Sequence, residues 1–441
     1  MYRLVWRCLA LVLGERERQK YSFLIYLVHC LHYHWAAKRP ALIHQDTPVT
    51  RHILRACQRL CKHFSAEKLH LTARSVDQKY HPTWYLFNGH LQTLMVALSN
   101  AAPDITYDRE LLVLSDGGTI SFDWATPASL VNVRSHTTQP TVLMLHGLTG
   151  NSEEPYIRKS AEKLLHHGWR VVVLNARGCG RNPVTSSKLV CPAYTQDVRE
   201  AIAYLQLHHL DSHTPLVAVG FSLGANILLK YVGEEGKQCP LKAAVSVANP
   251  YDFVVTNLHI THSWFRRLVY NHAMTQNLLK IVFDETNAHE HLHAHPLIDT
   301  HQLRQAKTLS EYDAIFSRHT FGYVTPMDIY RDASSAAYLK HIAIPTLCIS
   351  AHDDPICPHT CIPYEECRAN PNIVLAVTHS GGHVGFFTSQ HLLDDQPRMW
   401  CADVIAQYCN GMLKPVIDST MDKVESIEIR PPDNVVVPLV L

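Results

Sequence analysis

The chain has 441 residues, 46% of them hydrophobic, and its 40 lysines and arginines nearly balance 39 aspartates and glutamates for a net charge of +1. This length can bury one large α/β core, and the near-neutral charge without a basic cluster argues against nucleic acid as a partner. Thirteen scattered cysteines without a Cys-x-x-Cys pair exclude a zinc site or a disulfide framework and favour reduced thiols in a cytosol-facing protein.

The first 79 residues have a helical pattern and precede the main domain. Residues 21–37 are mostly apolar, and five of their large side chains recur at the spacing of one helical face: Leu24, Leu27, Val28, Leu31 and Trp35. A membrane-spanning helix needs about 20 apolar residues, whereas this run is shorter and contains histidines. No small-residue cleavage site indicates a secretory signal. We expect the segment to lie at a membrane surface; packing against the body of the protein is the alternative.

After residue 80 the pattern changes to strands. Residues 111–114 and 119–124 flank an Asp-Gly-Gly turn, which predicts a hairpin. Strands and helices then alternate, with strands at 141–146, 170–175, 216–220 and 243–248 and helices near 153–167, 195–209 and 223–233. Alternation of this kind predicts the α/β class, with a mostly parallel sheet covered by helices on both faces.

A glycine-rich turn follows the strand at 141–146. The turn reads His146-Gly147-Leu148-Thr149-Gly150, and such a turn supplies a backbone N–H to an oxyanion hole in hydrolases that use a serine nucleophile. We predict Leu148 and Leu223 as the two N–H donors. We expect His146 to brace the loop; a direct catalytic role is the alternative.

The sequence Gly220-Phe221-Ser222-Leu223-Gly224 lies between an apolar strand and a helix-forming run. A G-x-S-x-G motif in this position is typical of the nucleophile elbow, in which a tight turn exposes the serine hydroxyl above the sheet. Ser222 is therefore the predicted nucleophile. A serine needs a base to take its proton and a carboxylate to orient that base.

About 95 residues separate the strand at 243–248 from the next one at 344–350. A connection this long must carry structure of its own, and we predict a helical cap over the site at about 251–340. The cap contains alternating histidines at His289, His291, His293 and His295. A metal site needs ligands from several elements, so we expect a solvated loop here, no metal ion and no cofactor.

The predicted acid follows the strand at 344–350. Asp354 opens the turn Asp-Pro-Ile-Cys-Pro and is the preferred candidate, with Asp353 as the alternative. The predicted base is His383, because glycines on both sides let its loop carry the imidazole over the sheet edge. His379 is the alternative base.

From about residue 80 to about residue 411 the chain resembles one α/β-hydrolase subfamily, the AB hydrolase-4 group. This group contains YheT-type bacterial esterases, yeast medium-chain ethyl ester synthases and membrane-bound mammalian lipid hydrolases. The matching motifs lie at 88–93, 146–150, 175–180, 220–224, 353–355 and 381–386. The Gly-His-Leu-Gln-Thr block at 89–93 is the most diagnostic of them. The tail at 412–441 has no assigned function.

The resemblance implies ester hydrolysis on lipid-like substrates. The leading hypothesis is a serine carboxylesterase or lipase for medium-chain acyl esters, acylglycerols or phospholipids. An alcohol O-acyltransferase using the same acyl-enzyme and a non-catalytic lipid-binding protein are the alternatives. The resemblance also implies membrane association, at the endoplasmic reticulum facing the cytosol; a soluble cytoplasmic protein is the alternative. Oligomeric state stays open.

Overall fold

The structure is a computed structural model, and it describes residues 36–57, 60, 79–99, 102–127, 137–283, 291–292, 295–389 and 397–415. The segment predicted to associate with a membrane, 21–37, lies almost entirely outside these residues, as do His289, His293 and the tail beyond residue 415. Within the described ranges, no helix is both long and apolar enough to cross a bilayer.

The main sheet has the strand order β1-β9-β8-β7-β6-β4-β5-β3-β2. The strands are β1 (Ala41–His44), β2 (Ile105–Val113), β3 (Thr119–Pro127), β4 (Thr141–Leu145), β5 (Arg170–Asn175), β6 (Leu216–Phe221), β7 (Ala243–Val247), β8 (Thr346–Ala351) and β9 (Ile373–Thr378). Strands β4 to β9 run parallel, and the antiparallel strands lie at the two edges. The predicted hairpin is β2–β3, and the predicted α/β-hydrolase fold is confirmed.

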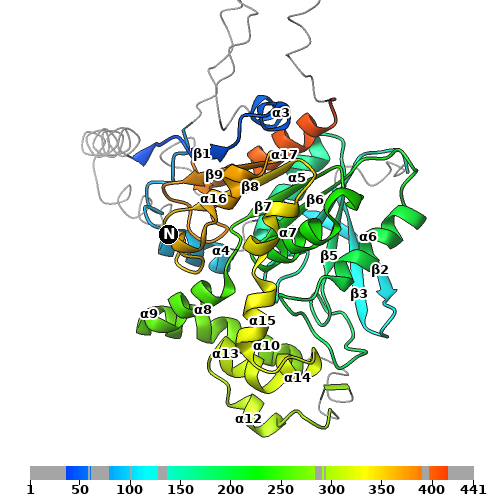
Figure 1. Cartoon of the computed structure of the whole chain (residues 1–441), viewed down its shortest axis with the longest axis vertical. Coiled ribbons are helices and arrows are strands. Elements are labelled where there is room, and N and C mark those ends of the chain that lie inside the picture. The colour runs from blue at the N-terminus through cyan, green and yellow to red at the C-terminus, as the bar shows by residue number, and fades with distance from the viewer. Residues whose placement is uncertain are drawn as a thin grey trace, which may run out of the picture.

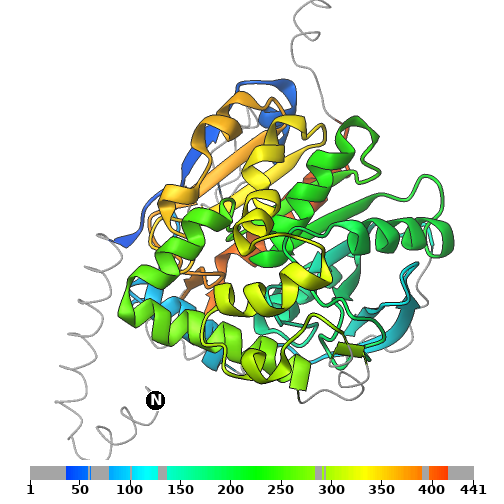
Figure 2. The same cartoon turned by 60° about the horizontal axis from the view of Figure 1, so that its bottom comes forward.

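The central strands are apolar because both of their faces are buried. Along β4, Val142 and Met144 join one hydrophobic cluster and Leu143 and Leu145 join the other. Helices α3 (Pro48–Ala56), α5 (Pro155–His166) and α17 (Trp400–Met412) supply the first cluster, whereas α6 (Gln196–His208), α7 (Leu223–Glu235) and α16 (Tyr364–Ala369) supply the second. The result is a three-layer sandwich with helices on both faces of the sheet (Figures 1 and 2).

The expectation of an entirely helical region before residue 80 needs correction. Strand β1 pairs antiparallel with β9, and Ala41 lies opposite Val377. Helix α3 packs on α17, where a Cβ added to Gly411 would lie 2.0 Å from the Cβ of Ala56. A four-residue strand is too short to show a period of two, and only its pairing with the exposed edge of β9 determines its conformation.

A helical insertion connects β7 to β8 and lies along one side of the sheet (Figure 1). Its elements are α8 (Phe253–His262), α9 (Trp264–Arg266), η3 (Arg267–Asn271), α10 (His272–Phe283), α12 (Thr300–Arg304), α13 (Leu309–Tyr312), η4 (Asp313–Ser317), α14 (Arg318–Thr320), α15 (Pro326–Ala333) and η5 (Ser335–His341). The remaining elements are α4 (Gly89–Leu98), η2 (Gly236–Gln238), η6 (His359–Cys361), β10 (Phe387–Thr388) and β11 (Arg398–Met399). Two of the cap elements, η3 and η4, are π-helical turns.

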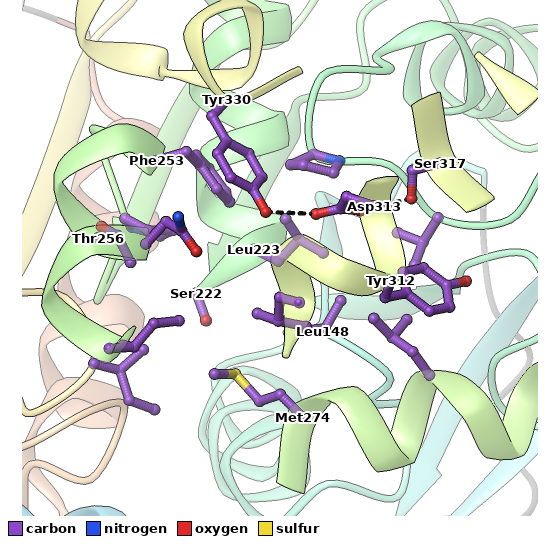
Figure 3. A pocket seen from close by; sticks show the side chains of 18 of the residues that line it. Leu148, Ser222, Leu223, Phe253, Thr256, Met274, Tyr312, Asp313, Ser317 and Tyr330 are labelled. Carbon is purple, nitrogen blue, oxygen red and sulfur yellow. Dashed lines mark hydrogen bonds between the residues drawn. The ribbon is translucent and has the colours of Figure 1, made fainter. Parts of the chain in front are cut away.

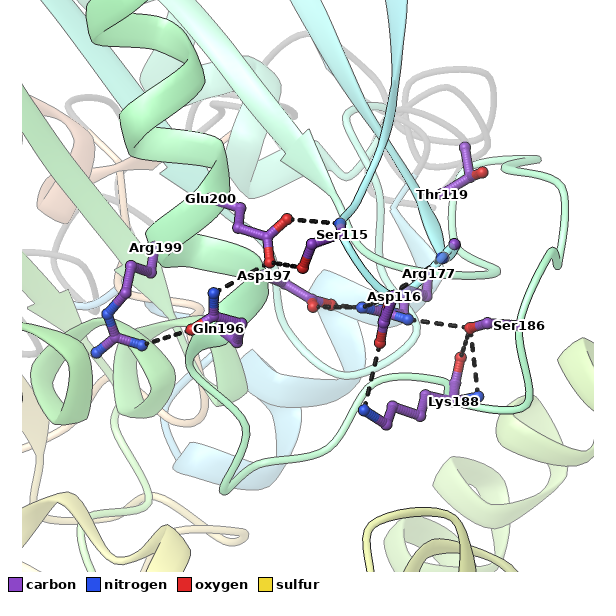
Figure 4. A network of polar contacts seen from close by, with 12 residues as sticks. Ser115, Asp116, Thr119, Arg177, Ser186, Lys188, Gln196, Asp197, Arg199 and Glu200 are labelled. Carbon is purple, nitrogen blue, oxygen red and sulfur yellow. Dashed lines mark hydrogen bonds and ion pairs between the residues drawn. The ribbon is translucent and has the colours of Figure 1, made fainter.

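A buried arginine ties the edge hairpin to the helical layer (Figure 4). Arg177, only 3% exposed, donates to both carboxylate oxygens of Asp197 in α6 at 2.7 and 2.8 Å. The same guanidinium donates to Asp116 in the hairpin turn at 2.8 Å and to Ser186 at 3.0 Å. Burial raises the pKa of Asp197 although Arg177 opposes that shift. The carboxylate therefore depends on Arg177 for compensation of its charge.

We expect Arg177→Met to lower the free energy of unfolding by about 3–5 kcal/mol, because it leaves a buried carboxylate without its cation. Urea unfolding followed by circular dichroism measures the loss. Arg199→Met is the matched control, since Arg199 is 35% exposed and pairs with Glu234 at the surface. Its loss should be about 1 kcal/mol or less. Equal losses in the two variants would contradict the structural role of Arg177.

Candidate active site

Ser222 occupies a strained turn between β6 and α7. Its backbone has φ 52° and ψ −118°, a region that residues other than glycine rarely adopt. The two motif glycines leave no room for a side chain. A Cβ at Gly220 would lie 2.5 Å from the carbonyl oxygen of Gly224, and one at Gly224 would lie 2.5 Å from the carbonyl oxygens of Leu145 and His146. The tight packing therefore explains why both motif positions are glycine.

A continuous chain of hydrogen bonds joins Ser222, His383 and Asp354. The Ser222 hydroxyl lies 2.7 Å from Nε2 of His383, and Nδ1 of His383 lies 2.9 Å from Oδ2 of Asp354. The other oxygen of Asp354 accepts the backbone N–H groups of Ile356 and Cys357, each at 2.8 Å. The turn after β8 thus fixes the carboxylate, and the carboxylate fixes the imidazole with Nδ1 protonated and Nε2 free to accept a proton.

The alternative acid and base lie elsewhere. Asp353 accepts the backbone N–H of Gly382 at 3.0 Å, so it holds the loop that carries His383. Burial raises its pKa. His379 is exposed, and its ring lies 6.4 Å from the ring of His352. Of the four candidates, only Asp354 and His383 are joined to Ser222 by hydrogen bonds.

The Gly-His-Leu-Gln-Thr block forms the start of α4 and packs beneath the loop that carries His383. The backbone N–H of His383 donates to the Thr93 hydroxyl at 2.8 Å, and that hydroxyl donates to the carbonyl of Gly89 at 2.7 Å. A Cβ at Gly89 would lie 1.9 Å from the carbonyl oxygen of Asp353. The sequence marked this block only as a family signature. The structure gives it a physical role, because it positions the imidazole from a segment 290 residues away.

The predicted oxyanion donors, Leu148 and Leu223, line the same pocket as Ser222. The loop after β4 passes directly above the serine, since a Cβ at Gly147 would lie 3.3 Å from the Cβ of Ser222. The next backbone N–H in that loop belongs to Leu148, and the first N–H of α7 belongs to Leu223. Their roles as donors stay a prediction.

His146 braces this loop, as the sequence suggested. Its Nε2 accepts the backbone N–H of Ala176 at 3.1 Å, and its Nδ1 lies 2.6 Å from the carbonyl oxygen of Gly147. Burial lowers the pKa of His146 to about 4. The ring is therefore neutral and donates through Nδ1, and it connects the loops that follow β4 and β5.

A cavity of about 90 Å³ lies beside Ser222 (Figure 3). The cap contributes Phe253, Ile260, Met274 and Leu278 to its apolar lining. Such a lining suits a hydrocarbon chain rather than a polar group. Burial of a chain in the cavity would exclude water from the side of the serine that faces the cap.

One buried carboxyl lies in the cavity wall and was not singled out from the sequence. Asp313, in η4, accepts the hydroxyl of Ser317 at 2.6 Å and that of Tyr330, in α15, at 2.8 Å (Figure 3). Burial raises the pKa of Asp313 to about 6. The hydrogen bond from Tyr330 ties α15 to η4 at the pocket. No local motif indicates a role for Asp313, because Tyr330, the partner that links it to another helix, lies in a separate element.

Cys357 is a second residue that the sequence did not assign. Its Sγ lies 3.6 Å from Nδ1 of His383, and the thiol donates to the carbonyl of Ala248 at 3.7 Å. Burial raises the pKa of the thiol well above its usual value, so the group stays protonated. Ligand atoms of Asp354, Cys357 and His383 lie within 4.8 Å of one another. A protonated thiol and an Asp–His pair already bonded to each other are poorly suited to a metal ion. Of the ten cysteines in the described part of the chain, all but Cys239 are buried.

Comparisons with known proteins agree with this geometry. A family model described as alpha/beta hydrolase fold matches residues 140–390. The chain is 32% identical over 364 residues to Embryogenesis-associated protein EMB8 of Picea glauca, covering 79% of this chain and 78% of that protein. It is 34% identical over 313 residues to Phospholipase ABHD3 of Homo sapiens, covering 70% and 74%. It is 30% identical over 389 residues to Medium-chain fatty acid ethyl ester synthase/esterase 2 of Saccharomyces cerevisiae, covering 74% and 84%.

We expect Asp354→Asn to lower turnover of a soluble ester by about 10³- to 10⁴-fold, because an amide cannot hold the imidazole in the required tautomer. Asp353→Asn is the matched control, since its amide oxygen can still accept the N–H of Gly382. It should stay within about tenfold of the wild type. Steady-state hydrolysis of a medium-chain nitrophenyl ester measures both variants. A reversed ranking would require a different acid.

Proposed function

This chain belongs to the α/β-hydrolase family and is a serine ester hydrolase, and we propose that Ser222 is its nucleophile, His383 its general base and Asp354 the carboxylate that orients the base. One observation carries the proposal: the hydrogen bonds of 2.7 and 2.9 Å that join the three side chains at the strained turn. Together they meet the geometric requirements for an activated serine.

The acylation step follows from these positions. As Oγ of Ser222 bonds to the ester carbonyl carbon, its proton passes to Nε2 of His383. The carbonyl oxygen takes up the negative charge, and the N–H groups of Leu148 and Leu223 stabilise it. The bond from the carbon to the alcohol oxygen then breaks, and His383 returns the proton to that oxygen. Asp354 stays ionised and stabilises the imidazolium that forms between the two transfers.

Deacylation repeats these steps with water as the nucleophile. His383 takes a proton from a water molecule whose oxygen attacks the acyl carbon, and Ser222 leaves and recovers its proton from His383. The products are the carboxylic acid and the free enzyme. An alcohol in place of water would yield a new ester, and the yeast relative is named both a synthase and an esterase. Alcohol acyl transfer is therefore the second candidate activity.

The substrates we propose are medium-chain acyl esters, acylglycerols and phospholipids. The apolar lining beside Ser222 supports an acyl chain as the bound group, because each buried methylene contributes about 0.8 kcal/mol. The names of the relatives point the same way: Phospholipase ABHD3 and, at 30% identity over 278 residues, the Monoacylglycerol lipase of Saccharomyces cerevisiae.

We also propose that the protein associates with a membrane surface through residues 21–37, at the endoplasmic reticulum facing the cytosol. The support comes from the sequence spacing of Leu24, Leu27, Val28, Leu31 and Trp35, which a helix would place on one apolar face, as in interfacial helices. Lipid esters reside in membranes, so an enzyme held at the surface meets its substrate without extracting it into water.

Ser222→Ala should abolish labelling by a fluorophosphonate probe and lower ester turnover by about 10³-fold or more. The probe reacts only with an activated serine, so it reads the nucleophile directly. In-gel fluorescence and nitrophenyl ester hydrolysis provide the two measurements. Ser380→Ala, on the loop that carries His383 but without an assigned role, is the control. Labelling that persisted in Ser222→Ala would refute the assignment.

Deletion of residues 1–35 should move the protein from the membrane pellet to the supernatant while soluble-ester turnover stays within about twofold of the wild type. The deletion ends before Lys38, whose backbone pairs with Tyr80, and before β1. Cell fractionation with immunoblotting gives the distribution. A truncated protein that remained in the pellet would place the main anchor elsewhere.

A further inference from the structure

The outer side of the cap carries large apolar side chains in solvent. Leu258 of α8 is 60% exposed, Trp264 of α9 is 77% exposed and Leu268 of η3 is 61% exposed. Arg267 lies beside Leu268 in the sequence and is also exposed. We call Leu258, Trp264, Arg267 and Leu268 the docking face. An exposed tryptophan with two leucines on one short helical segment has a free-energy cost in water that requires a reason.

The segment that carries the docking face has an unusual charge pattern. Residues 253–283 contain no aspartate or glutamate, whereas they contain Arg266, Arg267 and Lys280. The chain as a whole has almost equal numbers of acidic and basic residues. A segment with three cations and no anion is complementary to a negatively charged surface, and the exposed tryptophan suits the boundary between headgroups and acyl chains.

The docking face and the substrate cavity meet at α8, which carries Leu258 of the docking face and four residues of the cavity wall. Phe253, Thr256, Asn257 and Ile260 of α8 line the cavity beside Ser222. These positions follow the i, i+3, i+4, i+7 spacing of one helical face. Leu258 lies on the opposite side, in solvent. Helix α8 therefore separates the cavity from Leu258, and α9 and η3, which carry the rest of the docking face, follow α8 directly in the chain.

Contacts with α4 hold the docking face in place. Nδ1 of His90, in α4, lies 2.8 Å from the hydroxyl of Tyr270, and its ring lies 5.4 Å from the ring of Phe265. Arg266 donates to the carbonyl of His259 at 3.0 Å, which ties α9 back to α8. Figure 1 shows α8 and α9 at the margin of the cap, away from the helices that cover the sheet. The face is thus a fixed surface on α8 and on the two short helical elements that follow it.

We infer that the docking face binds the surface of a bilayer that contains anionic lipids. Trp264, Leu258 and Leu268 enter the boundary between headgroups and acyl chains, and Arg267 pairs with anionic headgroups. The inference rests on the proposed function, since it places the wall of the acyl cavity against the source of the substrate. A second copy of the chain is the less favoured occupant, because the cations of the segment would repel those of its mate.

Side-chain footprinting of the full chain tests the contact directly. Hydroxyl radicals oxidise exposed tryptophan and leucine, with the products counted by mass spectrometry. With vesicles of phosphatidylcholine and phosphatidylserine, we expect oxidation of Trp264 to fall several-fold. Leu207 of α6, which is 78% exposed and far from the cap, should be unaffected. Unchanged oxidation of Trp264 in protein that sediments with the vesicles would overturn the inference, even if residues 21–37 hold the protein there.

Activity measurements separate the docking face from the chemistry. Trp264→Ser combined with Leu268→Ser should lower hydrolysis of an ester embedded in the same vesicles by about tenfold or more. Hydrolysis of a soluble ester should not change, because neither side chain lines the cavity. Leu207→Ser is the matched control and should leave both activities intact. Equal activity of the double variant and the wild type on vesicles would overturn the inference.

Two further outcomes are distinguishable. In the first, Trp264 is protected without vesicles, and sedimentation velocity shows a dimer that the double variant does not form. This result would assign the face to self-association and overturn the lipid contact. In the second, wild-type protein is inactive on soluble esters although vesicles protect Trp264 from oxidation. This result would refute the proposed function and leave the docking face supported.

Because added salt screens charge, the protection of Trp264 by vesicles should also weaken as ionic strength rises.

Discussion

The active site depends on one backbone conformation that the surrounding structure enforces. Ser222 has a positive φ, and an isolated peptide would leave that conformation at once. Helix α7 begins so close to the end of β4 that Gly224 lies against the carbonyls of Leu145 and His146. Strand β6 is buried along its whole length and cannot move to relieve the strain. The packing of the sheet thereby holds Ser222 in its strained conformation.

The base and the acid of the site come from segments far from Ser222 in the sequence. His383 reaches Ser222 only because the loop after β9 rests on α4, through Thr93 and the close contact at Gly89. The carboxylate of Asp354 is oriented by N–H groups of its own turn. Base and acid are thus fixed by different means, one by a remote helix and the other locally. Loss of the helix contact should misplace the imidazole while the carboxylate keeps its position.

Features encoded locally could be predicted from the sequence. The strand expected at 170–175 coincides with β5, because strands buried on both faces are continuous apolar runs. Ser222 was identifiable because its glycines are neighbours in sequence. Strand β1 and Thr93 were not assigned, because each acquires its role from partners far away in the chain. Asp313 was not assigned because its link to Tyr330 joins two separate elements of the cap. Tertiary contacts of this kind leave no periodic or motif signal.

The direction of β1 has a geometric consequence. Because β1 is antiparallel to β9, its first residue, Ala41, lies beside Val377 at the carboxyl end of β9. Ser222 and His383 follow the carboxyl ends of parallel strands, so the chain enters the domain at the catalytic edge of the sheet. A lipid-bound segment upstream of β1 would tether that edge of the sheet to the membrane surface. Tethering of this kind raises the effective concentration of the second contact into the millimolar range, about as high as short linkers allow. The tethered enzyme would then bring its active site to the lipid by rotating at the surface, without first diffusing to it through water.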